Sequence, residues 1–309
     1  MSTNPLVSIQ IPTYNQQRFI KDALDSALAQ TYDNLQIIVA DDCSPDYDIF
    51  EFLADYKDNP KVLIHRNETN LGRVANYRAT LFNLAKGEWF MNLDGDDYLV
   101  NNNFVANAIT SINQFDKEQI AFYKGNTSLQ KIEESGIEKI MLNEHTYLIK
   151  NKDYLANIQY DYGFSHASQL YNTEKAKSVN VYNRNLLDID YFSFLKCIST
   201  GDIIVNNEPV YHWRIHEAQE TYTVTPKEYL KRFEAVKELA AVYKDMGTDG
   251  RSAVAFTRYM VYIYYLSTVF KQKVLIQELP IIFSKTKFNL KYLIPLLATV
   301  KNYYFPKRN

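Results

Sequence analysis

The sequence predicts an α/β fold with a Rossmann-like, mostly parallel sheet flanked by helices and a helical extension at its C-terminus. Three observations support this prediction. Short apolar runs alternate with helical patterns through the first hundred residues, polar residues gather in the loops that follow those runs, and the pattern is helical from Pro226 onward. Strands that alternate with helices form parallel sheets covered on both faces.

The strands and helices of the first half follow from apolar spacing. Continuous apolar runs of strand length occupy residues 6–11, 35–40, 61–65 and 88–93. Apolar residues recur at helical spacing in residues 18–30, 47–57 and 74–86. The loops after the strands are residues 12–17, 41–46, 66–72 and 94–98. Ligands of parallel sheets bind beyond the carboxyl ends of the strands, so these loops predict a binding site.

The rest of the chain is less regular. Strands are expected at residues 120–124, 202–205 and 209–214, and a helix at residues 188–199. Residues 160–171 form an aromatic-rich run that includes His166. We therefore predict an α/β domain at residues 1–222, with two halves at residues 1–100 and 101–222. A helical, basic region follows at residues 223–309.

Charge is unevenly distributed. The chain of 309 residues has a net charge of only −2, so we expect no nucleic acid partner. Residues 251–309, however, contain ten Lys or Arg and one Glu, a net charge of +9, which leaves −11 for the remainder. Basic helices with Tyr and Phe suit an anionic membrane surface. Packing on the catalytic domain, or at a dimer interface, is the alternative, and the oligomeric state stays open.

The sequence predicts a cytoplasmic protein, or one peripheral to the inner face of the plasma membrane. Met1 to Pro5 lack the charged and apolar regions of a signal peptide. The apolar segments at residues 254–270, 274–283 and 290–300 are interrupted by charge or proline, so none spans a bilayer. Only Cys43 and Cys197 occur, which favours reduced thiols over a disulfide framework.

An acidic loop follows the run at residues 88–93. It contains Asp94, Gly95, Asp96 and Asp97. Carboxylates so close together repel each other unless a cation compensates. Mg²⁺ or Mn²⁺ takes hard oxygen ligands and leaves positions for phosphate oxygens, so a divalent metal is the expected cofactor. The alternative is a solvated turn whose Asp side chains cap a helix near Asn101.

The polar loops contain an ordered series of short motifs. They are VSIQIPTYN (7–15), QTY (30–32), VADDCSPD (39–46), NLG (70–72), Arg78, AKGE (85–88) and the acidic loop. In this order and at this spacing, residues 6–100 resemble the family-two inverting glycosyltransferases, which have the glycosyltransferase-A fold and a D-x-D motif. The resemblance implies a metal-dependent transferase of the kind that assembles bacterial cell-surface glycans. Residues 1–222 would then be its catalytic domain, with a nucleotide-binding half (1–100) and an acceptor-binding half (101–222). Residues 160–169, which include His166, are expected to shape the acceptor site.

The resemblance also implies roles for individual residues. Tyr14 would stack on the base, Asp42 would accept a hydrogen bond from its edge, and Asp96 would hold the metal on the diphosphate. The residues expected to bind the nucleotide sugar are Pro12, Tyr14, Asn15, Asp41, Asp42, Arg78, Asp94, Gly95 and Arg214. The expected metal ligands are Asp96, Asp94 and His216. The alternative for Tyr14 is an aromatic ring packed in its loop, and for Asp42 a cap of a helix or turn. The alternative for Arg78 is a residue on a solvated helix face.

An inverting transfer needs a base that deprotonates the acceptor hydroxyl. By resemblance this base is Asp190, in LDIDYFSFL (187–195). The family has an acid immediately before the base, where this chain has Ile189, so Asp188 stays an alternative. The segment EPVYHWRIHEAQET (208–221) resembles the family's closing segment, with Arg214 on phosphate, His216 on metal and Thr221 in a loop over the donor. His212 is expected to be structural.

The expected activity is therefore transfer of a hexosyl or N-acetylhexosaminyl group from a nucleotide sugar, UDP by family habit, to an acceptor hydroxyl. The acceptor is expected to be a saccharide or a lipid-linked saccharide. A catalytically inactive nucleotide-sugar-binding protein of the same fold is the main alternative. A nucleotidyltransferase would need a glycine-rich basic phosphate loop after the first strand, and residues 12–17 do not form one.

Overall fold

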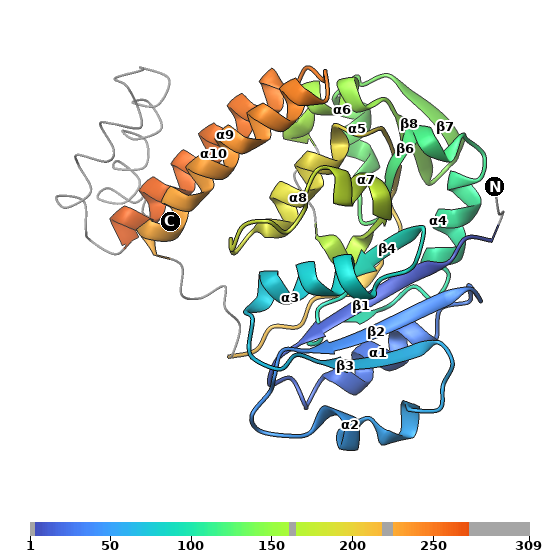
Figure 1. Cartoon of the computed structure of the whole chain (residues 1–309). Coiled ribbons are helices and arrows are strands. Elements are labelled where there is room, and N and C mark those ends of the chain that lie inside the picture. The colour runs from blue at the N-terminus through green and yellow to red at the C-terminus, as the bar shows by residue number, and fades with distance from the viewer. Residues whose placement is uncertain (1–3, 161–164, 218–224, 272–309) are drawn as a thin grey trace, which may run out of the picture.

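The computed structural model describes residues 4–160, 165–217 and 225–271. Its main feature is a nine-stranded sheet in the order β3-β2-β1-β4-β9-β6-β10-β8-β7. A second sheet of two strands, β5 and β11, lies beside it, and two long helices end the described chain (Figure 1). The predicted α/β class with C-terminal helices is confirmed.

The four strands of the first half are parallel to one another, as their alternation with helices predicts. They are β1 (Val7–Thr13), β2 (Leu35–Asp41), β3 (Val62–Arg66) and β4 (Trp89–Asn92). Successive side chains of a strand point to opposite faces. Ile37 and Val39 therefore enter the core on one face of the sheet, and Ile38 enters the core on the other. Both faces are apolar, which explains the continuous apolar runs.

The helices of the first half are shorter than predicted. They are α1 (Ile20–Leu28), α2 (Ile49–Phe52), the 3₁₀ turn η1 (Ala54–Tyr56), α3 (Arg73–Ala79) and η2 (Thr80–Leu84). α2 begins late because the Asp48 carboxylate accepts hydrogen bonds from the backbone N–H groups of Phe50 and Glu51. η2 is a π turn, closed by the Ala85 N–H on the Thr80 carbonyl at 3.0 Å.

The second half of the sheet mixes parallel and antiparallel strands. They are β6 (Ile120–Lys124), β7 (Lys139–Asn143), β8 (Thr146–Ile149), β9 (Gln169–Asn172) and β10 (Asp202–Asn206). β9 lies antiparallel between β4 and β6 and so joins the two halves of the sheet. The sequence predicted β6 and β10 and missed the other three. β7 is an edge strand with exposed apolar side chains, so it lacks the expected alternation.

Helices of this half cover the sheet and connect its strands. They are α4 (Phe104–Ile112), η3 (Lys117–Gln119), α5 (Leu129–Glu134), α6 (Asn151–Ala156), η4 (Ile158–Tyr160), η5 (His166–Ser168), α7 (Thr173–Ser178) and α8 (Ile189–Ile198). α8 lies close to the predicted range of 188–199. Nine of its ten residues are buried, and Asp190 is the exception.

The small sheet positions the closing segment. β5 (Tyr98–Leu99) pairs antiparallel with β11 (Tyr211–His212), which is shorter than the predicted strand at 209–214. Just beyond β11, the Arg214 backbone N–H donates to the Asp97 carboxylate at 3.0 Å. This pairing brings residues from near position 214 next to the acidic loop.

The C-terminal helices α9 (Pro226–Asp245) and α10 (Arg251–Lys271) pack together and against α8 and α6 (Figure 1). Their buried side chains Phe233, Leu239 and Tyr265 belong to the same core as Phe194 of α8. Of the two alternatives for this region, packing on the catalytic domain therefore holds for α9 and α10. None of the described helices is long and apolar enough to cross a membrane. The predicted boundary near residue 222, and residues 274–283 and 290–300, lie outside the described residues.

Because α9 shares the catalytic core, shortening a buried side chain there should destabilise the whole domain. We expect Leu239→Ala to lower the free energy of unfolding by about 2–5 kcal/mol, the usual range for a buried Leu. Urea denaturation followed by far-UV circular dichroism measures this.

The control is Lys237→Ala, two residues earlier on the same helix. Lys237 is exposed and pairs only with Glu234 on the surface, so a change within about 0.5 kcal/mol is expected. Equal stability of Leu239→Ala and wild type would contradict a shared core.

Candidate functional site

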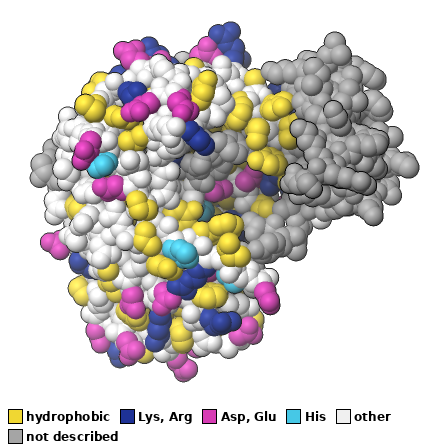
Figure 2. Space-filling view, turned by 180° about the vertical axis from the view of Figure 1, so that it is seen from behind, with side chains coloured by type: hydrophobic (Ala, Val, Ile, Leu, Met, Phe, Trp, Pro, Cys, Tyr) yellow, Lys and Arg dark blue, Asp and Glu magenta, His cyan; other side chains and the backbone are white. Residues whose placement is uncertain are grey.

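A cavity of about 520 Å³ opens at the carboxyl ends of β1, β2 and β4. Small-molecule sites commonly measure about 300–1,000 Å³. Seven of the predicted residues line it: Pro12, Tyr14, Asn15, Asp42, Asp94, Asp96 and His216. The sequence analysis missed eleven others: Thr13, Gln16, Phe19, Asn70, Gly72, Arg73, Asn76, Tyr77, Asp97, Leu187 and Trp213. The face opposite to that of Figure 1 is hollowed near its middle, where acidic and basic side chains are visible (Figure 2).

The loop after β1 forms one wall of the cavity. Asn15 has a φ of 54°, a conformation that Asn tolerates, and its N–H donates to the Ser44 hydroxyl at 2.8 Å. This bend leaves the Tyr14 ring 44% exposed at the cavity. Gly95 lies behind the loop rather than in the cavity, because a Cβ there would come within 2.6 Å of Gln16 and 3.1 Å of the Pro12 carbonyl. A larger residue would push this wall outward.

The two acids after β2 have different positions. Asp41 is fully buried and accepts hydrogen bonds from the Ser44 N–H at 3.1 Å and the Ser44 hydroxyl at 2.5 Å. It therefore supports the loop and does not line the cavity. The Asp42 carboxylate lines the cavity and also accepts from the backbone N–H groups of Leu71 and Gly72, each at 2.8 Å. Asp42 thus fixes the start of α3.

Arg73, and not Arg78, is the arginine of α3 at the cavity. Its guanidinium donates to the carbonyls of Leu186 and Leu187 at 3.2 and 2.9 Å, and to the Tyr77 hydroxyl at 3.3 Å. Arg78 lies outside the cavity, where it donates to the Val181 carbonyl at 3.0 Å and packs over Phe82. Arg73 follows directly on the NLG motif, at the start of a helix that faces the sheet edge. That position in the sequence could have indicated Arg73 as a residue of the site.

Asp94 lies at the centre of a hydrogen-bond cluster. It accepts from the Tyr77 hydroxyl at 2.6 Å and from the Asn92 amide at 3.2 Å, and lies 3.3 Å from the His166 ring. Burial alone would raise the pKa of Asp94, but His166, with help from Tyr77, holds that pKa at about 2. Asp94 is therefore ionised at neutral pH.

Asp96 and His216 meet on the opposite wall. The Asp96 carboxylate lies 2.9 Å from the His216 Nε2 atom. Burial and the neighbouring charge of Asp94 raise the pKa of Asp96. Burial and the charge of Asp94 also raise the pKa of Asp97, to about 8. This end of the cavity therefore disfavours further negative charge and would favour a cation.

The alternative bases Asp188 and Asp190 have separate environments. The Asp188 carboxylate accepts a hydrogen bond from the Arg232 side chain of α9 at 2.8 Å. Asp190, in the first turn of α8, forms no ion pair within the described parts of the chain, and it does not line the cavity itself. Burial raises the pKa of Asp190, while His166 lowers it. His166, which was expected to shape the acceptor site, lies beside Asp94.

The rest of the closing segment packs around the cavity. The Arg214 side chain pairs with Asp22 at 2.5 Å and packs over the rings of Phe19 and Tyr98, so it does not line the cavity. His212 packs on Tyr98, in agreement with its expected structural role. Thr221 lies outside the described residues. Trp213 lines the cavity and is 53% exposed.

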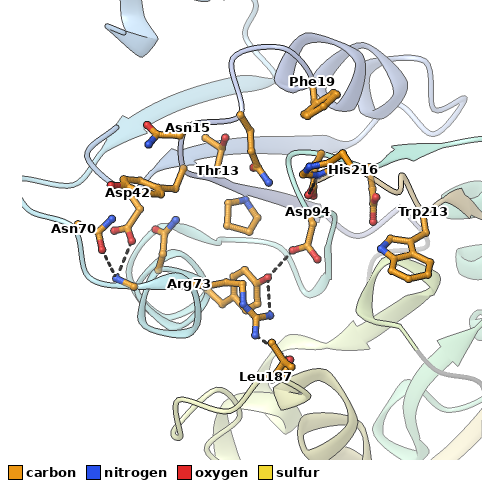
Figure 3. A pocket seen from close by; sticks show the side chains of 18 residues that line it. Thr13, Asn15, Phe19, Asp42, Asn70, Arg73, Asp94, Leu187, Trp213 and His216 are labelled. Carbon is orange, nitrogen blue, oxygen red and sulfur yellow. Dashed lines mark hydrogen bonds and ion pairs between the residues drawn. The ribbon is translucent and has the colours of Figure 1, made fainter. Parts of the chain in front are cut away.

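The labelled residues follow one another along the cavity. Asp42, Asn15 and Asn70 lie at one end, Asp94 and His216 lie further along, and Trp213 lies beyond them (Figure 3). The first group offers an aromatic ring nearby, amides and a carboxylate. The second, together with Asp96 beside His216, offers two carboxylates and an imidazole. This order of groups along the cavity suits a ligand with an aromatic base, a charged linker and a polar terminal group.

The sequence model of glycosyl transferase family 2 matches residues 8–166, which include β1 to β4, the acidic loop and His166. This match covers more than half of the chain. The chain belongs to glycosyl transferase family 2. Membership of the family accounts for the order in which the polar loops follow β1, β2, β3 and β4.

Relatives with similar sequences are bacterial. An uncharacterized glycosyltransferase of Rickettsia felis is 29% identical over 218 residues, which are 70% of this chain and 35% of the relative. One of Rickettsia typhi is 28% identical over 235 residues, 75% of this chain and 70% of the relative. The putative colanic acid biosynthesis glycosyl transferase WcaA of Escherichia coli is 35% identical over 97 residues, 31% of this chain and 34% of the relative. The first and third alignments span about a third of those relatives.

Solved structures share the fold. TarS of S. aureus (residues 1–349, in complex with UDP-GlcNAc) has a TM-score of 0.61 at 19% identity, over 96% of this chain and 80% of TarS. The mannosyltransferase PcManGT of Pyrobaculum calidifontis, in complex with GDP-Man and Mn²⁺, has a TM-score of 0.52 at 13% identity, over 99% of this chain and 88% of its own. The glycosyltransferase-A type of fold is thereby confirmed.

The Asp42 contacts predict a stability effect of a small change. In Asp42→Asn, the amide group cannot accept all the hydrogen bonds that the carboxylate accepts from Leu71, Gly72 and Asn67. We expect a loss of about 1–3 kcal/mol in the free energy of unfolding, the cost of unsatisfied buried donors. Urea denaturation measures it. Asp46→Asn, at an exposed position of the same loop, should match wild type, and an unchanged Asp42→Asn would contradict the anchoring role.

Proposed function

We propose that the protein is a metal-dependent, inverting glycosyltransferase that transfers a hexosyl or N-acetylhexosaminyl group from a UDP-sugar to a hydroxyl of a saccharide or lipid-linked saccharide. The observation that best supports this is the single cavity lined by Tyr14, Asp42, Asp94 and Asp96 at the strand ends of a family-two fold. The acceptor would belong to a bacterial cell-surface glycan, as the name of the WcaA relative suggests.

The nucleotide would bind at the end of the cavity nearest Asp42. The exposed Tyr14 ring offers a face for the base, and Asn15 and Asn70 offer amide groups for its edge or for the ribose. Asp42 already accepts three hydrogen bonds from the protein. Besides accepting a hydrogen bond from the base, it would therefore hold residues 71 and 72 against the nucleotide. Arg73 takes the role that the sequence analysis gave to Arg78, because its guanidinium is the one at the cavity.

A divalent metal would be held by Asp96 and His216, with Asp94 close by, and would neutralise charge on the departing diphosphate. The residues fit such an ion. Burial and Asp94 raise the pKa of Asp96, which indicates a shortage of positive charge at the site. The described residues contain no group of three or more His, Cys, Asp or Glu side chains arranged for a metal. Phosphate oxygens of the donor and water would therefore have to complete the shell, as they commonly do for Mg²⁺.

Asp190 would be the general base. Asp188 is committed to Arg232 of α9, whereas Asp190 has no ion pair within the described parts of the chain. The raised pKa of Asp190 makes it a better proton acceptor than an exposed carboxylate. It would take the proton of the acceptor hydroxyl as this attacks the anomeric carbon on the face opposite the diphosphate. No covalent enzyme intermediate forms, so the anomeric centre inverts.

UDP is favoured over other nucleotides by two solved neighbours. TarS was solved with UDP and UDP-GlcNAc, and GalNAc-T7 with UDP, GalNAc and Mn²⁺, while PcManGT was solved with GDP-Man. The net charge of +9 in residues 251–309 supports association with an anionic membrane surface on the cytoplasmic side, where a lipid-linked acceptor would be presented.

Nucleotide binding tests the donor site directly. We expect calorimetric titration to detect binding of UDP with Mn²⁺ present and little binding after chelation. Asp96→Ala should weaken UDP binding at least about tenfold, because it removes a carboxylate that would hold the metal ion. Arg73→Ala should also weaken it, whereas Arg78→Ala, outside the cavity, is the matched control. Absence of binding by any nucleotide under either condition would sink the proposal.

The base assignment is tested by turnover. Asp190→Asn should reduce sugar transfer by about 10²–10⁴-fold, the usual contribution of a general base, and leave the Kd of UDP within about twofold. Release of UDP from several UDP-sugars, with and without a saccharide acceptor, measures this. Asp188→Asn should reduce stability more than turnover, because it breaks the ion pair with Arg232. Full activity of Asp190→Asn would exclude it as the base, and inactivity of the wild type would favour a binding protein.

A further inference from the structure

Trp213 is an exposed aromatic residue that the donor site does not need. Its side chain is 53% exposed, yet it lines the cavity. The other tryptophan of the chain, Trp89, is fully buried in β4. Within the described residues, the Trp213 indole packs on no other aromatic ring and on no cation. Because the ring lines the cavity, a ligand bound at this end would contact it.

The backbone on both sides of Trp213 is fixed. His212 pairs with Tyr98 between β11 and β5 and packs on the Tyr98 ring with centroids 5.0 Å apart. Arg214 donates its N–H to Asp97 at 3.0 Å and pairs with Asp22 at 2.5 Å. The indole is therefore presented at a defined position, and a rigid aromatic ring loses little conformational entropy when a ligand packs on it.

The position of Trp213 along the cavity identifies the part of the substrate that it would meet. Asp42 and Asn70 lie at the far end, Asp94 and His216 lie between, and Trp213 is beyond them (Figure 3). If the base occupies the Asp42 end and the diphosphate the Asp96 region, the transferred sugar and the acceptor occupy the Trp213 end. The acceptor arrives from solvent after the donor is bound, and the Trp213 ring is exposed at the end of the cavity that the nucleotide leaves open.

We propose that Trp213 is the stacking platform for a sugar ring of the acceptor, and that the acceptor is recognised through this saccharide rather than through a lipid or phosphate. This inference rests on the proposed function. A pyranose has a face of C–H groups that packs on an aromatic ring, while its hydroxyl groups stay at the edges. A ring that is half exposed can cover such a face and leave those hydroxyls at its edges free.

Intrinsic fluorescence tests the proposal, because acrylamide reaches the exposed Trp213 and not the buried Trp89. The probes are the methyl glycosides of glucose, galactose, mannose, N-acetylglucosamine and N-acetylgalactosamine, at millimolar concentrations, with UDP and Mn²⁺ saturating. At least one glycoside should protect Trp213 from quenching. Calorimetry should then show that Trp213→Ala weakens binding of that glycoside about tenfold, as the loss of an aromatic contact predicts, and that Trp213→Phe weakens it less.

Ile215→Ala is the matched control, since Ile215 is 71% exposed on the same segment and does not line the cavity. It should bind the glycoside like wild type. The proposal is overturned if UDP binds but no glycoside protects Trp213, or if Trp213→Ala weakens UDP as much as the glycoside. If UDP does not bind, the proposed function fails. Protection of Trp213 by a glycoside would then still show that a sugar binds there. If UDP does not bind and no glycoside protects Trp213, both the proposed function and the role of Trp213 are wrong.

Discussion

The site depends on keeping the Asp94 carboxylate charged in a partly covered position. A carboxylate removed from water is stable only when hydrogen bonds and positive charge replace its solvation. Tyr77, Asn92 and His166 provide them, and they come from α3, β4 and η5. Segments separated by up to 89 positions in the sequence therefore have to meet at one point.

The same cluster extends toward α8. Tyr77 accepts a hydrogen bond from Arg73, and Arg73 donates to the carbonyls of Leu186 and Leu187, just before Asp188 and Asp190. The first half of the chain and the segment that leads into α8 are thus connected through hydrogen bonds at the cavity, in addition to the shared sheet. Electrostatic preorganisation of this kind fixes charges before a substrate arrives.

The sequence predicted the parts of the fold that local chemistry determines. The runs that form β1, β2 and β4 are apolar because both faces of the sheet are covered, and the loops that follow them contain polar residues because they end at the cavity. β9 could not be predicted, since QLYN has too few apolar residues for a pattern, and its position between β4 and β6 follows from long-range pairing. The family motifs located Asp42, Asp94 and Asp96, whereas the choice of Arg73 over Arg78 depends on which face of α3 meets the cavity. Trp213 was visible only as an aromatic residue in an otherwise polar segment.

The ion pair between Asp188 and Arg232 limits how segments of this chain could be combined with those of another protein of its family. Asp188 is the N-cap residue of α8, and Arg232 lies in α9, so each helix contributes one charge of the pair. A chimaera that takes α8 from one protein and α9 from another would leave a charge unpaired unless both proteins have the same two residues. The two helices should therefore be transferred together when a chimaera is built.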